Sequence, residues 1–354
     1  MTKTTIAISW FGLPQYAARQ LRTAISHLDA PYTIIGTKPS VPVRGVEEAL
    51  GQPVVWIEHN SRPTWKDVGL IPPDLFVQSG WGFGCFQGLA EEVKKSNGVV
   101  IGLSDANWRG TLRQYVAGAV KFRVHLRNHF DAMIVPGKSG KRLMKHFGMP
   151  ESSIYTGMYG ADPQLFFGGE RLAERPRRLL FVGQLIDRKN ILRFANLFVR
   201  TQACANGWKL RICGGGELRP SLPVHPNVEY FDFVQPEQLC AHYRQSQFLV
   251  LPSYSEAWGL VVHEATSIGC ALLLASTVGS VPDLADSTNS ILFDPYRDSA
   301  INSAIDAATS RSSEWLNEAE GVSRKKASEF GPARFRDELL RAVADFFPDY
   351  RKKD

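Results

Sequence analysis

Short apolar runs alternate with longer amphipathic segments along most of this 354-residue chain. Runs rich in valine, isoleucine and leucine are typical of strands that are buried on both faces of a sheet. Apolar residues that recur three or four positions apart indicate helices that pack on one side. Strand and helix patterns in alternation predict an α/β fold with a doubly wound, mostly parallel sheet.

In the first half of the chain, each predicted strand is short and several are followed by a predicted helix. The strands are expected at residues 4–9, 32–36, 54–57, 74–77, 98–103 and 130–136. The helices are expected at residues 16–28, 86–95, 112–130 and 138–147. In the basic segment 112–130, the apolar members of the helix are Val116, Val120, Val124 and Leu126.

The second half repeats the pattern. Strands are expected at residues 179–182, 208–213, 228–233, 248–251, 271–275 and 291–293. Helices are expected from residue 191, over 260–268, over 301–308 and over 324–347. The length suits two domains, each large enough to bury its own core. We place them at residues 1–168 and 169–330, with a glycine-rich, charged linker at 167–175 and a last helix, about 331–350, that returns to the first domain.

Composition and charge narrow the class of protein. Apolar residues make up 44% and charged residues 21%, as in soluble globular proteins. No apolar run approaches the ~20 residues that span a bilayer. The apolar run at the start of the sequence is too short for a secretion signal. The five cysteines are scattered without metal-ligand spacing, which favours reduced thiols in a cytoplasmic protein. Nothing in the sequence indicates a nucleic-acid partner.

Two glutamates stand out because of their positions relative to a predicted strand and helix. Glu256 follows the apolar run 248–251 in a loop, and Glu264 lies eight residues later on the helix that begins near Leu260. Ligands of open α/β sheets bind at the carboxyl ends of the strands, where helix amino-termini also favour phosphate. The pair therefore suits a ligand that carries hydroxyl groups. The alternative is a helix cap and a solvated helix residue.

The segment from Pro252 to Ala265 resembles the Glu-x7-Glu signature of retaining, nucleotide-sugar-dependent glycosyltransferases of family 4 (group 1), although Trp258 stands where phenylalanine is commoner. The resemblance is dense over residues 178–295 and thinner over the rest. It implies the GT-B fold, in which two Rossmann-like domains face each other across a cleft. It also implies that Glu256 holds the donor sugar and Glu264 the ribose.

The same resemblance assigns further residues to the donor site. Lys189 and Arg188 would stabilise the departing diphosphate, together with backbone amides at Trp258, Gly259 and Leu260. Additional donor contacts are implied for Gly12 from the first domain, Gly183, Gln184, Gly214 and Val234. Gln184 replaces the usual arginine, and Asp105 lies near the position of a histidine that many members place beside the sugar. Asp105 is therefore a catalytic candidate, with helix capping as its alternative.

The function that this resemblance implies is transfer of a sugar from a nucleotide-diphosphate sugar to an acceptor hydroxyl, with retention, in the synthesis of a glycan, glycolipid or cell-envelope polysaccharide. No cofactor and no metal are expected, since the sequence has no Asp-x-Asp motif and Lys189 and Arg188 supply positive charge. The alternatives are a nucleotide-sugar 2-epimerase of the same fold and a catalytically degenerate partner subunit.

Net charge is unevenly distributed along the chain. The total is +6, and residues 1–168 account for all of it, with 18 Lys or Arg against 12 Asp or Glu. Lys138, Lys141, Arg142 and Lys145 are spaced to share one side of a helix. We therefore expect either weak, peripheral docking of the first domain on an anionic membrane, where a lipid-linked acceptor would be reached, or a solvated basic helix.

Overall fold

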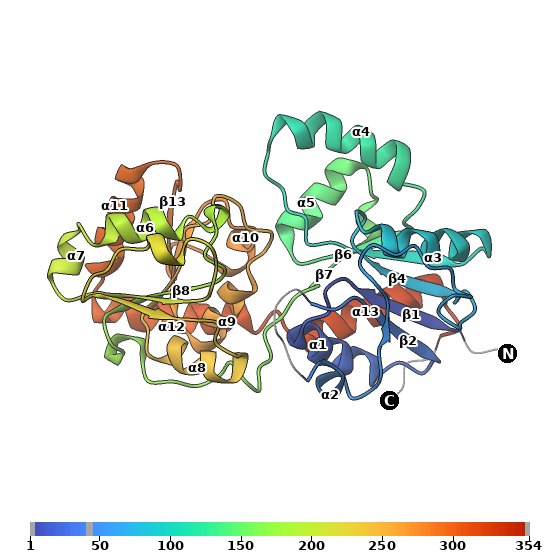
Figure 1. Ribbon diagram of the computed structural model, residues 1–354, viewed down its shortest axis with the longest axis horizontal. Coiled ribbons are helices and arrows are strands. Elements are labelled where there is room, and N and C mark those ends of the chain that lie inside the picture. The colour runs from blue at the N-terminus through green and yellow to red at the C-terminus, as the bar shows by residue number, and fades with distance from the viewer. Residues whose placement is uncertain (1–3, 40–44, 351–354) are drawn as a thin grey trace. The chain divides into compact units, whose positions relative to one another are not determined.

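The computed structural model describes residues 4–39 and 45–350. The chain divides into two compact units, residues 1–160 with 331–354 and residues 161–330 (Figure 1). Each unit is an α/β domain with helices packed on both faces of one parallel sheet. This is the Rossmann-like architecture that the alternation of apolar runs and amphipathic segments predicts.

In the described part of the chain, the first unit holds a seven-stranded sheet in the order β3-β2-β1-β4-β5-β6-β7. Neighbouring strands pair in parallel throughout. The strands are β1 (Ile6–Trp10), β2 (Tyr32–Gly36), β3 (Val55–Trp56), β4 (Leu75–Ser79), β5 (Val99–Leu103), β6 (Ala132–Val135) and β7 (Ile154–Thr156).

Alternate residues of these strands form two apolar layers, one on each face of the sheet. Ile6 and Ile8 of β1 belong to the layer that includes the last helix of the chain, and Ala7 belongs to the opposite layer. The helices are α1 (Gln15–Ile25), α2 (Val46–Leu50), α3 (Gly84–Lys95), α5 (Lys138–Phe147) and α13 (Pro332–Phe346), and a helical segment of three parts, η1 (Gln114–Gly118), α4 (Ala119–Lys121) and η2 (Phe122–Leu126).

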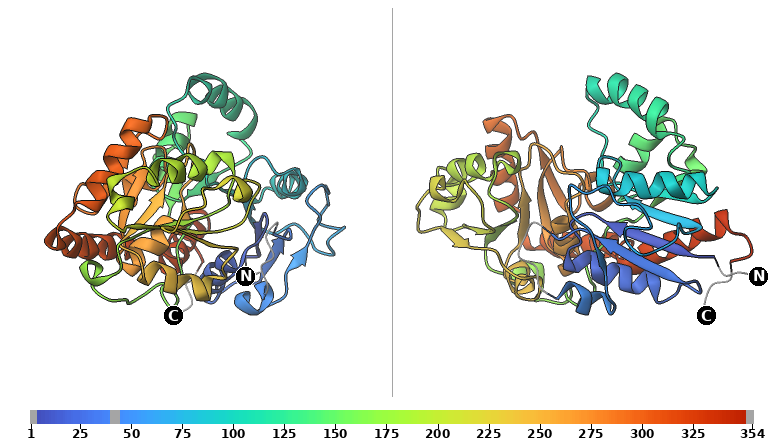
Figure 2. Two further views of the ribbon diagram at one scale, coloured as in Figure 1. Left: turned by 60° about the vertical axis from the view of Figure 1, so that its left-hand side comes forward. Right: turned by 45° about the vertical axis from the view of Figure 1, so that its right-hand side comes forward.

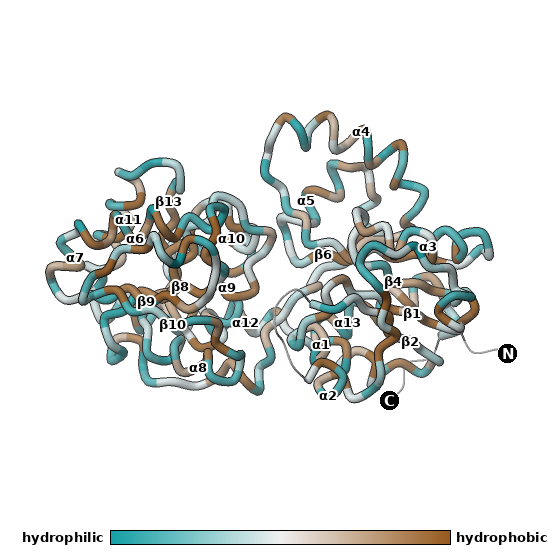
Figure 3. The backbone as a smooth tube through the Cα atoms, in the orientation of Figure 1, coloured by the Kyte–Doolittle hydropathy of each residue, from teal (hydrophilic) through white to brown (hydrophobic). Residues whose placement is uncertain are grey.

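The second unit, as far as it is described, holds a six-stranded parallel sheet in the order β10-β9-β8-β11-β12-β13. Figure 3 shows its strands as hydrophobic stretches, as expected for a sheet covered on both faces. The strands are β8 (Arg178–Val182), β9 (Lys209–Cys213), β10 (Val228–Phe231), β11 (Phe248–Leu251), β12 (Ala271–Ala275) and β13 (Ser290–Phe293).

The helices of the second unit connect these strands, and the short 3-10 turns lie in loops. The helices are α6 (Ile191–Phe198), α7 (Gln202–Ala205), α8 (Pro236–Arg244), α9 (Leu260–Ile268), α10 (Val281–Leu284), α11 (Asp298–Thr309) and α12 (Ser313–Ala327). Across the two units, the 3-10 turns are η3 (Glu151–Ser153), η4 (Leu172–Glu174), η5 (Asp187–Lys189) and η6 (Arg219–Ser221).

In both sheets the strand order reverses direction at one point. In the first sheet, β2 and β4 flank β1, and in the second sheet β9 and β11 flank β8. At β1/β4 and at β8/β11, the connections that follow the two neighbouring strands therefore lead to opposite sides of the sheet. Ligands of doubly wound sheets bind at such a switch point, beyond the carboxyl ends of the strands.

Two sequence predictions about the organisation of the chain need correction. The boundary lies at 160/161 rather than 168/169, because residues 161–168 bond to the second unit. For example, the Sγ of Cys240 donates to the carbonyl of Leu165, and Arg244 donates to the carbonyl of Phe167. The expected single helix over 324–347 is two helices, α12 and α13. Gly331, with a φ of 115°, and a proline at the first position of α13 separate them.

The last helix packs where the sequence predicts. Helix α13 lies against α1 and β7 of the first unit (Figures 1 and 2). Its buried residues include Phe335, Leu339 and Val343, which join the apolar layer beneath α1. The carboxyl-terminal segment therefore completes the core of the first unit after the chain has formed the second one.

Candidate active site

The switch point of the second sheet brings together the two residues that carry opposite charges in the predicted donor site. Glu256 lies in the loop after β11, and Lys189 lies at the end of the loop after β8. The Lys189 Nζ donates a hydrogen bond to the Glu256 carboxylate, and Arg188 Nη1 lies 3.6 Å from the same oxygen. The side chains of Glu256 and Lys189 are each only 11% exposed, so the pair lies largely out of solvent.

Backbone hydrogen bonds fix three loops around this ion pair. The amide of Tyr254 donates to the carbonyl of Arg188, and the Arg188 guanidinium donates to the carbonyl of Ser255 at 2.7 Å. Glu256 also forms an isolated parallel bridge with Val278 of the loop after β12. The loops that follow β8, β11 and β12 are thus bonded to one another through Glu256 and Arg188. Such bonding holds a charged site in place without the ligand.

Glu264 occupies a different environment on α9. Its side chain is buried, and the Tyr243 hydroxyl of α8 donates to Glu264 Oε2 at 2.7 Å. Burial raises the pKa of Glu264 to about 7, and the bond from Tyr243 acts in the opposite direction. At neutral pH, the Glu264 carboxyl group is therefore close to half protonated. Glu256 and Glu264, which the signature pairs, have different partners in this structure.

The raised pKa of Glu264 predicts a pH-dependent stability. The ordinary pKa is 4.5, so the folded state holds the proton more tightly than the unfolded chain. This contribution is complete below about pH 4.5 and is lost as the pH rises through about 7. Glu264→Gln is neutral at every pH, so the free energy of unfolding of the variant relative to the wild type should increase by on the order of 3 kcal/mol between these values.

The urea unfolding transition of the second unit, recorded at pH 4.5 and at pH 7.5, measures this difference. Glu318→Gln, a change at an exposed position of α12, is the matched control and should show no such trend. An equal effect of Glu264→Gln at both pH values would contradict the raised pKa.

The predicted phosphate-binding amides lie at the start of α9. Gly259 precedes the helix with a φ of 86°, a conformation that favours glycine, and Leu260 is the first helical residue. The first amides of a helix have no acceptor within it and suit an anion. Trp258 has a second role, because its side chain is buried, its Nε1 donates to Asp283 at 3.3 Å and its ring packs near Phe330.

The other predicted donor residues of the second unit lie at the carboxyl ends of β8, β9 and β10. Gln184 is exposed after β8, and Val234 is half-buried after β10. Gly183 and Gly214 also have a packing role, because a Cβ at Gly214 would lie 1.9 Å from the Gly183 carbonyl oxygen. These glycines therefore allow the ends of β8 and β9 to approach each other.

The buried His263, which no sequence motif singles out, bonds to the backbone near both ends of the second unit. His263 Nδ1 accepts from the amide of Ala161 at 2.7 Å, and its Nε2 donates to the carbonyl of Ala327 at 2.9 Å. Burial lowers the pKa of His263 to about 4, so the ring is neutral and both nitrogens keep these roles. Only the position of His263 next to Glu264 pointed toward it in the sequence.

In the first unit, the two predicted site residues lie beyond the carboxyl ends of different strands. Gly12 follows β1 at the switch point, has a φ of 58°, and donates its amide to Thr37 Oγ1 at 2.7 Å. Asp105 follows β5, and the Tyr159 hydroxyl donates to Asp105 Oδ2 at 3.3 Å. Both residues are thus at the edge of the first sheet where ligands bind, and Asp105 has a tyrosine partner.

A cavity of about 910 Å³ lies beside this edge of the first unit, between α3, α5 and the helical segment around α4. It begins where β4 and β5 end, at Trp81 and Ala106. The charged residues of its lining are mainly cationic, with Arg109, Arg113 and Lys121 against Glu91. The volume and position suit a polar small molecule.

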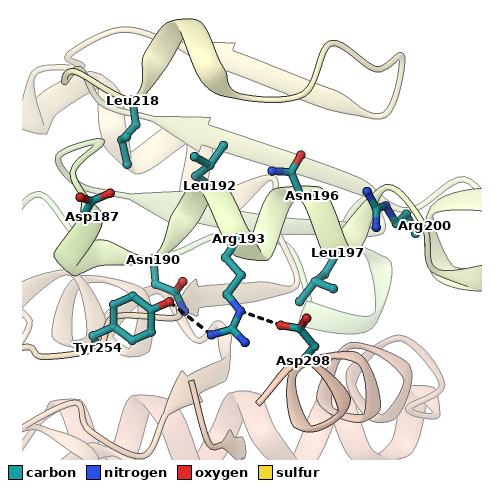
Figure 4. Close-up of a pocket in the computed structure, with 10 residues that line it drawn as sticks. All are labelled: Asp187, Asn190, Leu192, Arg193, Asn196, Leu197, Arg200, Leu218, Tyr254 and Asp298. Atoms are coloured by element: carbon teal, nitrogen blue, oxygen red, sulfur yellow. Dashed lines mark hydrogen bonds and ion pairs between the residues drawn. The ribbon is translucent and has the colours of Figure 1, made fainter. Parts of the chain in front are cut away.

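A second cavity, of about 400 Å³, lies in the second unit against α6 (Figure 4). Arg193 crosses it and bonds to Asp298 at 2.6 Å and to the Tyr254 hydroxyl at 3.3 Å (Figure 4). Neither Glu256 nor Lys189 lines this cavity. Its charged residues therefore tie the loop after β11 to α11, and the predicted donor site lies outside it.

In residues 4–39 and 45–350, no helix combines the length and the apolar character that crossing a membrane requires. No cluster of three or more His, Cys, Asp or Glu side chains is arranged to hold a metal ion within this range.

The match of the chain to a sequence family lies within the second unit. Residues 164–324 match the sequence model of the family described as glycosyl transferases group 1. The chain is 30% identical over 194 residues to a D-inositol 3-phosphate glycosyltransferase of Corynebacterium kroppenstedtii, an alignment that covers 47% of this chain and 43% of the relative. The chain thus spans less than half the length of this curated relative.

Solved structures extend the likeness of the fold to nearly the whole chain. HepE of Anabaena, in complex with UDP and glucose, superposes with a TM-score of 0.73 at 12% identity, covering 97% of this chain and all of HepE. A UDP-N-acetylglucosamine 2-epimerase of Listeria monocytogenes superposes with a TM-score of 0.67 at 12% identity, covering 99% and 98%. The fold is GT-B, and its second unit matches the sequence model of the glycosyl transferases of group 1.

Proposed function

We propose that this protein transfers a glycosyl group from a nucleotide-diphosphate sugar to an acceptor hydroxyl, with retention of configuration, as family 4 of the glycosyltransferases does. The observation that carries the proposal is the meeting of Lys189, Arg188 and Glu256 at the switch point of the second sheet. Two cations beside a helix amino-terminus suit a diphosphate, and a carboxylate next to them suits the hydroxyls of a sugar.

Each residue has a distinct role in the proposed reaction. The bond between the sugar carbon and the diphosphate oxygen breaks, and negative charge grows on the leaving group. Lys189 and Arg188 stabilise that charge, together with the first amides of α9, and no divalent metal is needed for this step. Glu256 accepts hydrogen bonds from the sugar and orients the reacting carbon. Glu264 accepts hydrogen bonds from the ribose, once it has released its proton.

The first unit binds the acceptor in this proposal. The cavity at the ends of β4 and β5 is large enough for a sugar or polyol, and Asp105 lies at the same edge of the sheet. Arg109 in its lining favours an acceptor that carries negative charge. This agrees with the inositol phosphate named for the relative from Corynebacterium kroppenstedtii. We place the reaction in the synthesis of a glycan, glycolipid or cell-envelope polysaccharide.

A second candidate function is epimerisation of the donor sugar. The fold of this chain is also that of the Listeria 2-epimerase, so the fold alone does not decide between the two activities. An epimerase needs no acceptor and releases nucleoside diphosphate or an altered nucleotide sugar from the donor alone. A degenerate subunit would bind the nucleotide and convert nothing, and the exposed Gln184 in place of an arginine is the residue that motivates this alternative.

A panel of nucleotide sugars tests the proposal. We expect one nucleotide sugar to raise the midpoint of thermal unfolding, since a ligand that binds only the folded state stabilises it by RT ln(1 + [L]/Kd), about 2.7 kcal/mol at a concentration one hundred times Kd. The stabilising donor is then incubated with and without phosphorylated and neutral polyols in EDTA. Release of nucleoside diphosphate only with acceptor supports transfer. Conversion of the donor without acceptor supports the epimerase, and no conversion supports the degenerate subunit.

A further inference from the structure

One helical segment of the first unit exposes a row of large apolar side chains. It runs from Leu112 through η1, α4 and η2 and lies outside the sheet, with α5 beneath it (Figures 1 and 2). Leu112 is 84% exposed, Val116 61%, Val120 57% and Val124 66%. We call these four residues the apolar stripe. The sequence pattern marked Val116, Val120 and Val124 as the apolar members of a helix, but the structure turns them to solvent.

The geometry of the segment keeps the stripe on one side. Its members are four residues apart, and in an α-helix this spacing drifts around the axis by about 40° per step. Both η1 and η2 are π-type turns, which close hydrogen bonds over five residues and so hold more residues per turn. The wider turns offset the drift. Figure 3 shows hydrophobic and hydrophilic positions alternating along this segment.

The opposite side of the same segment is already packed, so the stripe is not an unformed part of the core. Ala119 and Phe122 are buried, and the Phe122 ring lies 5.2 Å from that of Phe147 in α5 and 5.8 Å from that of Trp81. The guanidinium of Arg123 donates to the carbonyls of His146 and Phe147 at the end of α5. These contacts fix which face of the segment points outward.

Every Asp, Glu, Lys or Arg residue in the segment that carries the stripe is positively charged. Residues 106–130 contain five Arg or Lys and no Asp or Glu. Arg113 and Lys121 are exposed beside the stripe, and within the described ranges neither has an acidic partner within 4 Å. An acidic peptide would satisfy this charge, but four aliphatic side chains in one row need an apolar medium as well. An anionic lipid bilayer supplies both.

The basic helix α5, for which the sequence leaves both membrane contact and a solvated face open, is less suitable. Lys141 and Lys145 form ion pairs with Glu151 at 2.8 and 2.5 Å, and these two lysines lower the pKa of Glu151 to about 2. The Arg142 guanidinium stacks over the ring of Trp108. The apolar residues of α5 pack inward, since Leu143, Met144 and Phe147 are buried. Most of its charge is thus engaged within the protein.

We propose that the apolar stripe, flanked by Arg113 and Lys121, is the surface by which this protein docks on an anionic membrane. The four aliphatic side chains enter the headgroup region, and the two cations contact lipid phosphates. The inference rests on exposure, packing and charge, and it stands whether or not the protein transfers sugar. Binding of this kind is reversible, because one short apolar face and a few cations are far from a spanning helix.

Co-sedimentation of the full chain with vesicles tests the proposal. We expect pelleting with phosphatidylcholine vesicles that contain phosphatidylglycerol, none with phosphatidylcholine alone, and a decrease with rising salt. Arg113→Gln with Lys121→Gln should weaken binding by about twenty-five-fold, since each basic residue near an anionic leaflet strengthens binding by about fivefold. Val116→Ser with Val120→Ser should weaken it by about tenfold. All four positions are exposed, so the unfolding midpoint should change little.

Matched controls are exposed residues of the same types elsewhere. Val224→Ser, and Lys66→Gln with Arg297→Gln, should leave vesicle binding unchanged. Equal pelleting with neutral and anionic vesicles, no pelleting with either, or equal effects of stripe and control variants would overturn the proposal. A change of molar mass in light scattering caused by the serine variants without lipid would overturn it in favour of contact between copies of this chain.

Discussion

Replacing Glu256 with glutamine should lower kcat/KM for glycosyl transfer by about 10²–10³-fold, the effect of removing one preorganised charge from an active site. Glutamine keeps the size of the side chain and an oxygen that accepts a hydrogen bond. It removes the negative charge that pairs with Lys189 and, in our proposal, holds the hydroxyls of the sugar. The change therefore affects the chemistry more than the shape of the loop.

Steady-state kinetics with the donor found in the panel measures this effect. Because Glu256→Gln leaves a largely buried lysine without its partner, the unfolding midpoint of each variant is recorded as well. Glu318→Gln on the exposed face of α12 is the matched control and should keep full activity. A folded Glu256→Gln enzyme with wild-type kcat/KM would remove Glu256 from the proposed mechanism.

The fold was predictable from the sequence because both sheets are buried on two faces. Strands in such sheets must be apolar throughout, so β6, β11 and β12 appear in the sequence as short apolar runs with sharp ends. The break between α12 and α13 was missed, although Gly331 and Pro332 mark it. The apolar periodicity continues on both sides of that break and obscured it.

Features that depend on contacts between distant segments were not predictable. The row from Leu112 to Val124 has the periodicity of a packed helix, and periodicity does not tell which medium the apolar face meets. His263 lies on an apolar helix like any core residue, and only the fold brings Ala161 and Ala327 to its two ring nitrogens. The domain boundary shifted because residues 161–168 attach to the second unit through their backbone, which composition does not record.

The pairing within the candidate site shows the same limit. The signature joins Glu256 and Glu264 in sequence, but the partner of Glu264 is Tyr243, which no motif indicated. Conversely, Lys189 and Glu256 are 67 positions apart, and the order of the strands brings them together. Residue types at the ends of strands were predictable, and the partner of each residue was not.

Replacing Lys189 with alanine should lower kcat by about 10²–10³-fold and should also weaken binding of the nucleoside diphosphate product. The structure allows two roles for Lys189, since its Nζ contacts the Glu256 oxygen that Arg188 also approaches. If Lys189 stabilises the diphosphate, both kcat and the affinity for the nucleoside diphosphate should fall. If it only orients Glu256, kcat falls while the affinity for the product stays the same, and that outcome would contradict the proposed role.

Two measurements separate these outcomes for Lys189. Calorimetric titration with the nucleoside diphosphate gives the product affinity, and single-turnover kinetics in EDTA gives the rate of the chemical step. Lys189→Arg keeps a positive charge, so it should retain more of the product affinity and of the chemical rate than Lys189→Ala. Lys209→Ala, which removes an exposed lysine paired with Glu229 at 3.0 Å, should change neither. Complete loss of wild-type transfer in EDTA that magnesium restores would show instead that a divalent cation, and not Lys189, neutralises the leaving group.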